Sequence, residues 1–229
     1  MKTIGLIGGM SWESTALYYQ TINRTVAQRL GGLHSAKIQL ISLDFQDIAT
    51  RQKADDWSGM TDILCDAAAK LERGGADCVL ICTNTMHKVA PQVQAAIKVP
   101  VLHIVDALAE ALLSKGLNTV GLTGTRFTME QPFYSERLIG HGITCLTPDQ
   151  AQRDEIHRII FEELCRGVIK DDSRAKLVAC IDSLKAKGAQ AAVLGCTELI
   201  LSVGAKDSAL PVFDTTQLHA MAAVQFALS

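Results

Sequence analysis

The chain has 229 residues and a formal net charge of -2, from 22 basic and 24 acidic residues that form no blocks. This balance is not typical of proteins that bind nucleic acid or anionic membranes, so we expect small molecules as partners. The length allows one large domain or two lobes of roughly 100 residues. The N-terminus lacks the apolar core of a signal peptide and no apolar run approaches ~18 residues, so we expect a cytoplasmic protein.

Short apolar runs bounded by Gly, Asn or Pro alternate with longer stretches in which apolar residues recur at three- and four-residue spacing. This alternation is typical of βα units around a mainly parallel sheet and predicts an α/β fold. In chain order, the expected strands are Thr3–Ile7, Ile38–Leu43, Cys78–Cys82, Val101–Ile104, Thr119–Leu122, Ala191–Leu194 and a segment around Val212–Phe213. The expected helices include Ser14–Leu30, Met60–Glu72, Asp154–Leu164 and Arg174–Ala186.

Three segments recur in the same order at nearly constant spacing. Thr3-Ile-Gly-Leu-Ile-Gly8 returns 116 positions later as Thr119-Val-Gly-Leu-Thr-Gly124. Gly75-Ala-Asp-Cys-Val-Leu-Ile-Cys-Thr83 returns 113 positions later as Gly188-Ala-Gln-Ala-Ala-Val-Leu-Gly-Cys196, and Val99-Pro-Val101 returns as Leu210-Pro-Val212. The repeat predicts two pseudo-symmetric lobes with the active site in the cleft between them. We place the boundaries at the last echo, with residues 1–98 completed by 210–229 in one lobe and 99–209 in the other.

The second echo aligns Thr83 with Cys196, without gaps. Both residues follow a buried strand and begin a polar turn, and the carboxyl ends of strands are where open α/β sheets bind ligands. Because side chains alternate across a strand, Cys82 would then face into packing. Backbone N–H groups at a helix start would favour a thiolate at Cys196. The alternative is that Cys196 is simply a small buried residue of the core.

Four motifs of this sequence are similar to motifs of a known protein family: Ile4-Gly-Leu-Ile-Gly-Gly-Met10, Cys82-Thr-Asn-Thr-Met-His87, Gly195-Cys-Thr-Glu198 and Pro211-Val-Phe-Asp214. Through them the chain resembles, over nearly its whole length, the aspartate/glutamate racemase family. Family members show Cys-Asn-Thr followed two residues later by His, so Thr83 stands in the place of the first catalytic cysteine. This departure resembles the L-aspartate/glutamate-specific subgroup with a Thr/Cys pair. The resemblance implies a homodimer that acts on a small acidic amino acid without a cofactor or metal.

Racemisation requires one group that takes the α-proton from one face of Cα and another that returns a proton to the opposite face. Without an electron sink such as pyridoxal, the transition state must be stabilised by placement and electrostatics. A Cys196 thiol with a pKa lowered toward neutrality would be a suitable base. The Thr83 hydroxyl is too weakly acidic to be poised as a base and donates a proton more readily than it removes one. We therefore predict that Cys196 deprotonates the L substrate and that the D substrate reacts poorly.

The polar residues near the two strand ends supply the expected binding groups. The loop Gly8-Gly-Met10-Ser11 would offer backbone N–H groups to a carboxylate, although an ordinary turn explains it equally well. We expect Asn84, Thr85 and Thr197 to hold the α-amino and α-carboxyl groups. Glu198 would orient Cys196 or bind the substrate ammonium.

The resemblance also suggests what contacts the distal carboxylate of the substrate. Gln52, or the adjacent Arg51, follows the second strand in the position expected for this contact. Some aspartate racemases have a lysine where this chain has Cys165, and the neighbouring Arg166 would have to compensate. Glutamate racemases carry His where this chain has Glu198, which argues against the strict glutamate type.

Several other functions fit the sequence less well. A nicotinamide enzyme would require a G-x-G-x-x-G fingerprint, which glycines 5, 8 and 9 do not provide. The seven cysteines include no CxxC pair, and the spacing of Cys78, Cys82 and His87 fits no usual metal site. A two-lobed amino-acid-binding protein stays open, as do related activities on homoserine, hydantoins or maleate.

Overall fold

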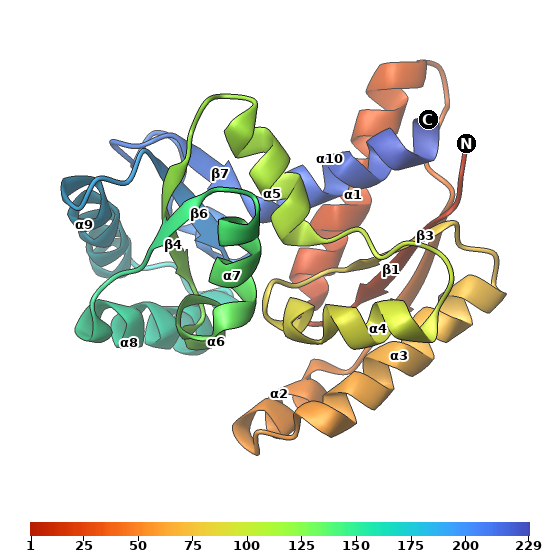
Figure 1. Ribbon diagram of the computed structural model, residues 1–229, viewed down its shortest axis with the longest axis horizontal. Coiled ribbons are helices and arrows are strands. Elements are labelled where there is room, and N and C mark those ends of the chain that lie inside the picture. The colour runs from red at the N-terminus through yellow and green to blue at the C-terminus, as the bar shows by residue number, and fades with distance from the viewer. The chain divides into compact units, whose positions relative to one another are not determined.

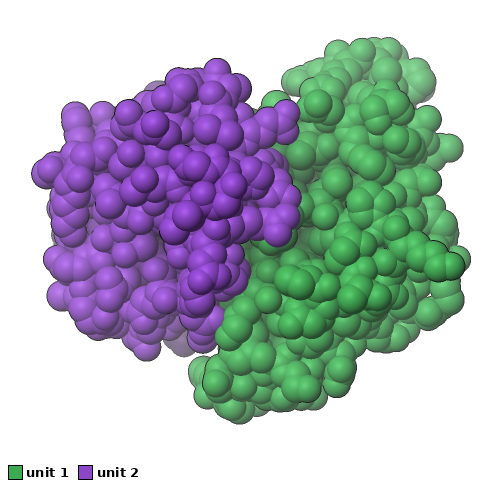
Figure 2. All heavy atoms as spheres, in the orientation of Figure 1, with its two compact units in different colours: residues 1–104, 216–229 green, residues 105–215 purple.

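The computed structural model describes residues 1–229, which form two compact units. Unit 1 contains residues 1–104 and 216–229, and unit 2 contains residues 105–215; Figure 2 colours them separately. Each unit is built around a parallel sheet flanked by helices, which confirms the predicted α/β fold.

Unit 1 has a three-stranded sheet in the order β2-β1-β3. Its elements, most of which are labelled in Figure 1, are β1 (Ile4–Gly8), α1 (Trp12–Leu30), β2 (Ile38–Ser42), α2 (Phe45–Lys53), α3 (Trp57–Arg73), β3 (Cys78–Ile81), the 3₁₀ helix η1 (Thr85–Val89), α4 (Ala90–Ala96) and α10 (Thr215–Leu228). Most of α10 belongs to this unit although it ends the chain, because its small apolar residues pack on the sheet together with α1.

The two faces of this sheet bury different side chains. Ile7, Val79 and Ile81 face α3 and α4, and they share one apolar cluster with residues of those helices. Leu80 and Cys82 face the opposite way, toward α1 and α10. Cys82 is fully buried there, as the alternation of side chains predicted.

Unit 2 has a four-stranded sheet in the order β5-β4-β6-β7. Its elements are α5 (Ile104–Leu113), β4 (Thr119–Gly124), α6 (Arg126–Glu130), α7 (Pro132–Gly140), β5 (Thr144–Leu146), α8 (Gln150–Arg158), the π-helical turn η2 (Ile159–Glu163), η3 (Leu164–Arg166), α9 (Asp171–Ala186), β6 (Ala191–Gly195), η4 (Leu199–Leu201) and β7 (Val212–Asp214). The single helix expected over 154–164 is thus α8 followed by a π-helical turn.

The strand registers repeat the internal similarity of the sequence. Gly5 pairs with Val79 in unit 1, and Gly121 pairs with Ala192 in unit 2, so the offsets of 116 and 113 hold in both sheets. The repeated segments Val99-Pro-Val101 and Leu210-Pro-Val212 also make the same backbone contact in both units. Val79 donates its N–H to the carbonyl of Pro100 at 2.9 Å, and Ala192 does the same to Pro211 at 2.9 Å.

Those two hydrogen bonds explain why the unit boundaries differ from the ones expected at 98/99 and 209/210. Val101 forms a parallel bridge with Val79, which keeps the chain in unit 1 beyond the echo up to residue 104. Likewise β7 pairs with β6, which keeps the chain in unit 2 up to residue 215. The expected strand Val101–Ile104 is therefore only a bridge, because α5 begins at Ile104. None of the helices combines the length and apolar character that a membrane span requires.

Candidate active site

Thr83 and Cys196 occupy equivalent positions in the two sheets. Ile81 pairs with Ile7 on β1, and Leu194 pairs with Thr123 on β4, at the corresponding step of each register. Thr83 and Cys196 each lie two residues further along, and both are beyond the carboxyl end of the strand. The sheet geometry therefore pairs Thr83 with Cys196, as the sequence repeat does, and Cys82 corresponds to Gly195.

The turn after β3 is held by short local hydrogen bonds. The N–H of Thr83 donates to the carbonyl of Ile81 at 2.8 Å, and the N–H of His87 donates to the carbonyl of Asn84 at 3.1 Å. Thr83 itself is half-buried, whereas Asn84 and Thr85 are buried. This turn thus gathers three of the predicted site residues at one strand end.

Gln52 contacts the segment that follows this turn, and Met10 shares an apolar cluster with that segment. Gln52 is buried near the end of α2, and its amide approaches the Sδ of Met86 at 3.6 Å. Met10 is buried in the same apolar cluster as Met86 and Ile48. Unit 1 therefore brings both predicted residues toward the segment that follows Thr83.

Arg51 points to a different partner. Its guanidinium forms a hydrogen-bonded ion pair with Asp56, which caps the start of α3. The Asp56 carboxylate also accepts the N–H of Gly59 at 2.9 Å. Gln52 and Arg51 were the two residues expected to contact the distal carboxylate of the substrate. Only Gln52 is turned toward the segment that follows Thr83.

The loop after β1 is less open to a ligand than expected. The N–H of Gly9 already donates to the hydroxyl of Thr15 at 2.8 Å. Gly9 has φ = 85°, and a Cβ there would lie 2.1 Å from the carbonyl oxygen of Leu43, so only glycine fits. Gly9 therefore shapes this turn, and its N–H is not available to a carboxylate.

Glu198 organises the strand end in unit 2. The thiol of Cys196 and the hydroxyl of Thr197 both donate to Oε2 of Glu198, at 3.0 and 2.7 Å. All three residues are buried. The carboxylate thus orients Cys196, which is the first of the two roles expected for it.

This arrangement raises the pKa of the Cys196 thiol instead of lowering it. Burial disfavours the thiolate most, and the negative charge of Glu198 adds to the effect. The expectation of a pKa lowered toward neutrality is thus wrong. Cys196 is thus a thiol that donates a hydrogen bond to the carboxylate of Glu198.

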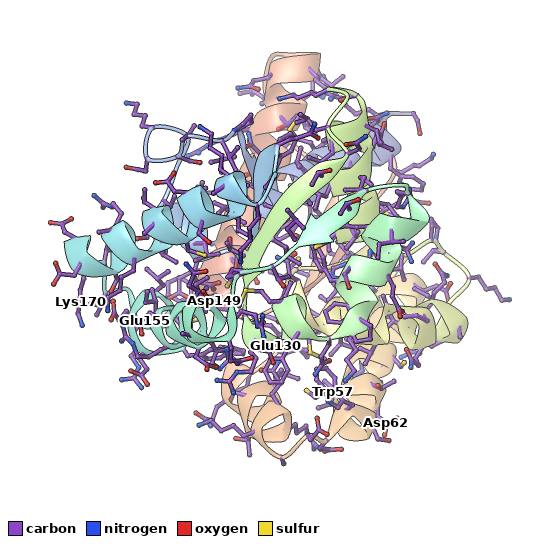
Figure 3. The ribbon with its side chains drawn as sticks, turned by 60° about the vertical axis from the view of Figure 1, so that its left-hand side comes forward. Trp57, Asp62, Glu130, Asp149, Glu155 and Lys170 are labelled. Carbon is purple, nitrogen blue, oxygen red and sulfur yellow. The ribbon has the colours of Figure 1, made fainter.

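Cys165 and Arg166 lie on the segment that follows the π-helical turn. Cys165 packs against the cluster that contains Cys196, whereas Arg166 is exposed. The segment is anchored through buried Glu163, which accepts hydrogen bonds from Ser173 at 2.6 Å and from Arg158 at 2.8 Å. Figure 3 labels Glu155 on α8 and Lys170 ahead of α9, whose side chains join the same network through Arg158 and Glu163.

The network predicts a loss of stability in acid. Hydrogen bonds from Arg158 to Glu155, and from Ser173 and Arg158 to Glu163, lower the pKa of each carboxyl from 4.5 to about 2. Carboxylates with lowered pKa values stabilise the fold fully above their unfolded pKa, so their contribution should disappear as the pH falls from about 4.5 to about 2. Urea unfolding at a series of pH values measures this decline.

Glu163→Gln should flatten that decline, because the amide does not titrate. Glu136→Gln, at an exposed position, serves as the matched control and should leave the slope unchanged. An identical acid slope in native and Glu163→Gln proteins would contradict a stabilising role for the network.

Two features near these strand ends are not among the residues predicted from the sequence. Thr125 and Thr128 are buried at the start of α6, and a Cβ on Gly195 would lie 3.2 Å from the Thr128 methyl group, so they lie next to the Cys196 strand end. The echo of Gly8 in Gly124 was the signal that could have revealed them. His87 belongs to the motif Cys82-Thr-Asn-Thr-Met-His87, and its ring nitrogens form hydrogen bonds with the backbone of Thr83 and of Ile104.

No group of three or more His, Cys, Asp and Glu side chains is arranged to hold a metal ion. Cys78 and Cys82 point into the apolar core with α1 and α10. His87 uses both ring nitrogens for backbone groups. The side chains of Cys78, Cys82 and His87 therefore do not converge on one point at which a metal ion could bind.

The sequence model of the Asp/Glu/Hydantoin racemase family matches residues 7–223. The chain belongs to this family. A candidate Asp/Glu racemase from Yersinia pestis is 50% identical, with a TM-score of 0.95 over 100% of both chains. An aspartate racemase homologue from Pyrococcus horikoshii OT3 is 34% identical, with a TM-score of 0.85 over 100% of both chains. The broad specificity amino-acid racemase RacX of Bacillus subtilis (strain 168) is 26% identical over 96% of each chain.

Membership of the Asp/Glu/Hydantoin racemase family supports an isomerase that acts on amino acids. The relatives carry names that range from aspartate racemase homologue to broad-specificity racemase. Family membership therefore fixes the class of reaction and leaves the choice of substrate to the residues of the site.

Proposed function

We propose that the protein racemises L-aspartate or L-glutamate without a cofactor, with Cys196 and Thr83 serving opposite faces of Cα. The observation that carries this proposal is the equivalence of the two residues in strand register, one beyond β3 and one beyond β6. A duplicated unit with one proton-transfer group in each copy suits a reaction that needs two such groups. The proposal requires that both strand ends serve one substrate.

In the proposed reaction the Cys196 thiol first passes its proton to Oε2 of Glu198, which already accepts its hydrogen bond. The ammonium group of a bound amino acid would favour this step, because a nearby positive charge stabilises a thiolate. The thiolate then takes the α-proton of the L substrate. Hydrogen bonds from Asn84, Thr85 and Thr197 to the α-carboxylate would stabilise the charge that develops on Cα.

Thr83 completes the proposed reaction by donating its hydroxyl proton to the opposite face of Cα. Its side chain is half-buried and makes no hydrogen bond in the structure, so the hydroxyl is available to a substrate. The alkoxide that remains recovers a proton from water, and the Cys196–Glu198 pair releases one. The proton balance is thus closed, and the weak acidity of the hydroxyl makes the reverse direction slow.

A neutral amino acid such as homoserine is the second candidate substrate. Arg51 is paired with Asp56 and Arg166 is exposed, so the predicted contact that remains for the distal group is the neutral amide of Gln52. A homodimer is also part of the proposal, and it rests on family resemblance alone.

Deuterium incorporation at Cα tests the proposal directly. L-aspartate, L-glutamate and L-homoserine are incubated with the protein in D₂O without added cofactor, and proton NMR and chiral chromatography follow each amino acid. We expect deuterium at Cα and appearance of the D form for the preferred substrate. An amino acid that binds, by calorimetry, yet gains no deuterium would point to a binding protein and overturn the proposal.

A further inference from the structure

His87 makes two hydrogen bonds to the backbone around the Thr83 turn. Its Nδ1 lies 2.8 Å from the carbonyl oxygen of Thr83, and its Nε2 accepts the N–H of Ile104 at 3.2 Å. Ile104 is the last residue of the first segment of unit 1, where α5 begins. The ring, which is 1% exposed, thus joins the turn that carries Thr83 to the end of this segment.

These partners fix the tautomer of the ring. A backbone N–H can only donate, so Nε2 of His87 must carry no proton. A backbone carbonyl can only accept, so Nδ1 must carry the proton. His87 is therefore a neutral imidazole with a defined orientation, and both nitrogens bond to backbone groups.

The Thr83 carbonyl depends on this ring for its hydrogen bond. In an α-helix the N–H of His87 would bond the carbonyl four residues earlier, which is that of Thr83. Here η1 is a 3₁₀ helix, and the same N–H bonds the carbonyl of Asn84 at 3.1 Å. The Nδ1–H of the imidazole therefore replaces the backbone N–H that an α-helix would offer to the Thr83 carbonyl. Without it, a carbonyl next to this buried ring would have no hydrogen-bond partner, which would lower the stability of the fold.

Neighbouring rings hold the imidazole in place. His103 and His219 both meet it edge to face, with ring centroids 4.6 and 5.5 Å away. His219 is itself fixed, because Tyr18 donates its hydroxyl to Nδ1 at 2.8 Å and Nε2 donates to the carbonyl of Leu102 at 2.7 Å. The frame around His87 is thus built from α1, α10 and the segment before α5.

We propose that His87 is a positioning residue for Thr83, which fixes the backbone of this residue so that its hydroxyl keeps one direction. The N–H of Thr83 is bonded to Ile81 and its carbonyl to His87, so the peptide groups on both sides are held. This inference rests on the proposed role of Thr83 as the donor to one face of Cα. Loss of the His87 contact should then impair that proton transfer selectively.

Two variants separate the two hydrogen bonds of the ring. In His87→Asn, the side-chain amide lies near the position of Nδ1 and retains a donor for the Thr83 carbonyl. In His87→Gln, the amide lies near the position of Nε2 and retains an acceptor for Ile104 but no donor for Thr83. Each variant keeps one bond and loses one, so the two serve as matched controls for stability.

The readout is the ratio of racemisation to deuterium incorporation, both measured from the L substrate. Incorporation reports proton removal and return at Cys196, whereas racemisation also requires Thr83. We expect His87→Gln to lower this ratio about tenfold or more, since a displacement of about 1 Å can cost 10²-fold in rate. His87→Asn should stay within about threefold of the native ratio. A purely structural role would lower both rates together in both variants.

A native ratio in folded His87→Gln would overturn the positioning role, as would an equal loss of ratio in His87→Asn. Nitrogen-15 NMR of the imidazoles supplies a measurement that does not depend on activity. The His87 ring should show a protonated Nδ1 and an unprotonated Nε2, and the opposite tautomer would overturn the inference. Absence of any exchange by the native protein would count against the proposed function instead, while the NMR result would still decide the contact.

Discussion

Replacing Cys196 with alanine is expected to lower both racemisation and deuterium incorporation from the L substrate by about 10³-fold or more. The change removes the proposed base, and a positioned acid or base contributes about 10²–10⁴-fold to a rate. Glu198 would retain its hydrogen bond from Thr197, so the strand end should stay ordered. Steady-state rates by chiral chromatography, with circular dichroism and thermal unfolding as checks of the fold, measure the effect.

Cys82→Ala is the matched control, because it removes a thiol at the other strand end. Cys82 is fully buried in the apolar cluster that it shares with α1 and α10, so we expect it to take no part in the proposed reaction. The variant should lose about 1 kcal/mol of unfolding free energy through the cavity and keep its activity. If Cys82→Ala were folded and as inactive as Cys196→Ala, the pairing of Thr83 with Cys196 would be wrong.

The second large effect is expected from Thr83→Cys, which should allow the protein to exchange the α-proton of D-aspartate or D-glutamate. A thiol forms its anion at accessible pH, whereas the threonine hydroxyl does not. Both side chains are small, and the backbone of residue 83 is held by Ile81 and His87, so the geometry should be retained. Deuterium incorporation into each enantiomer measures the gain, which should be about tenfold or more for the D form.

Thr83→Ala is the complementary variant. It should slow racemisation of the L substrate more than deuterium incorporation, because the Cys196 face is left intact. Native protein that exchanges D and L substrates at equal rates would contradict the proposed asymmetry. Such a result would mean that the residue-83 face already has an efficient base.

The sequence by itself determined the features that depend on local pattern and on duplication. Apolar periodicity predicted the parallel α/β units, and the echoes aligned Thr83 with Cys196 before any strand register was known. Strand alternation also placed Cys82 in the core, because the direction of a side chain follows from its position along a strand. Each of these depends on residues that are close in sequence or on a repeated unit.

Only the tertiary structure decided the features that depend on which groups share a buried environment. The boundaries at 104 and 215 follow from the pairing of Val101 with Val79 and of β7 with β6. The raised pKa of Cys196 follows from its burial and the direction of Glu198, which spacing cannot fix. The proposed role of His87 depends on its hydrogen bond with Ile104, 17 positions away, and hydrogen bonds over such separations are set by how the chain folds back on itself.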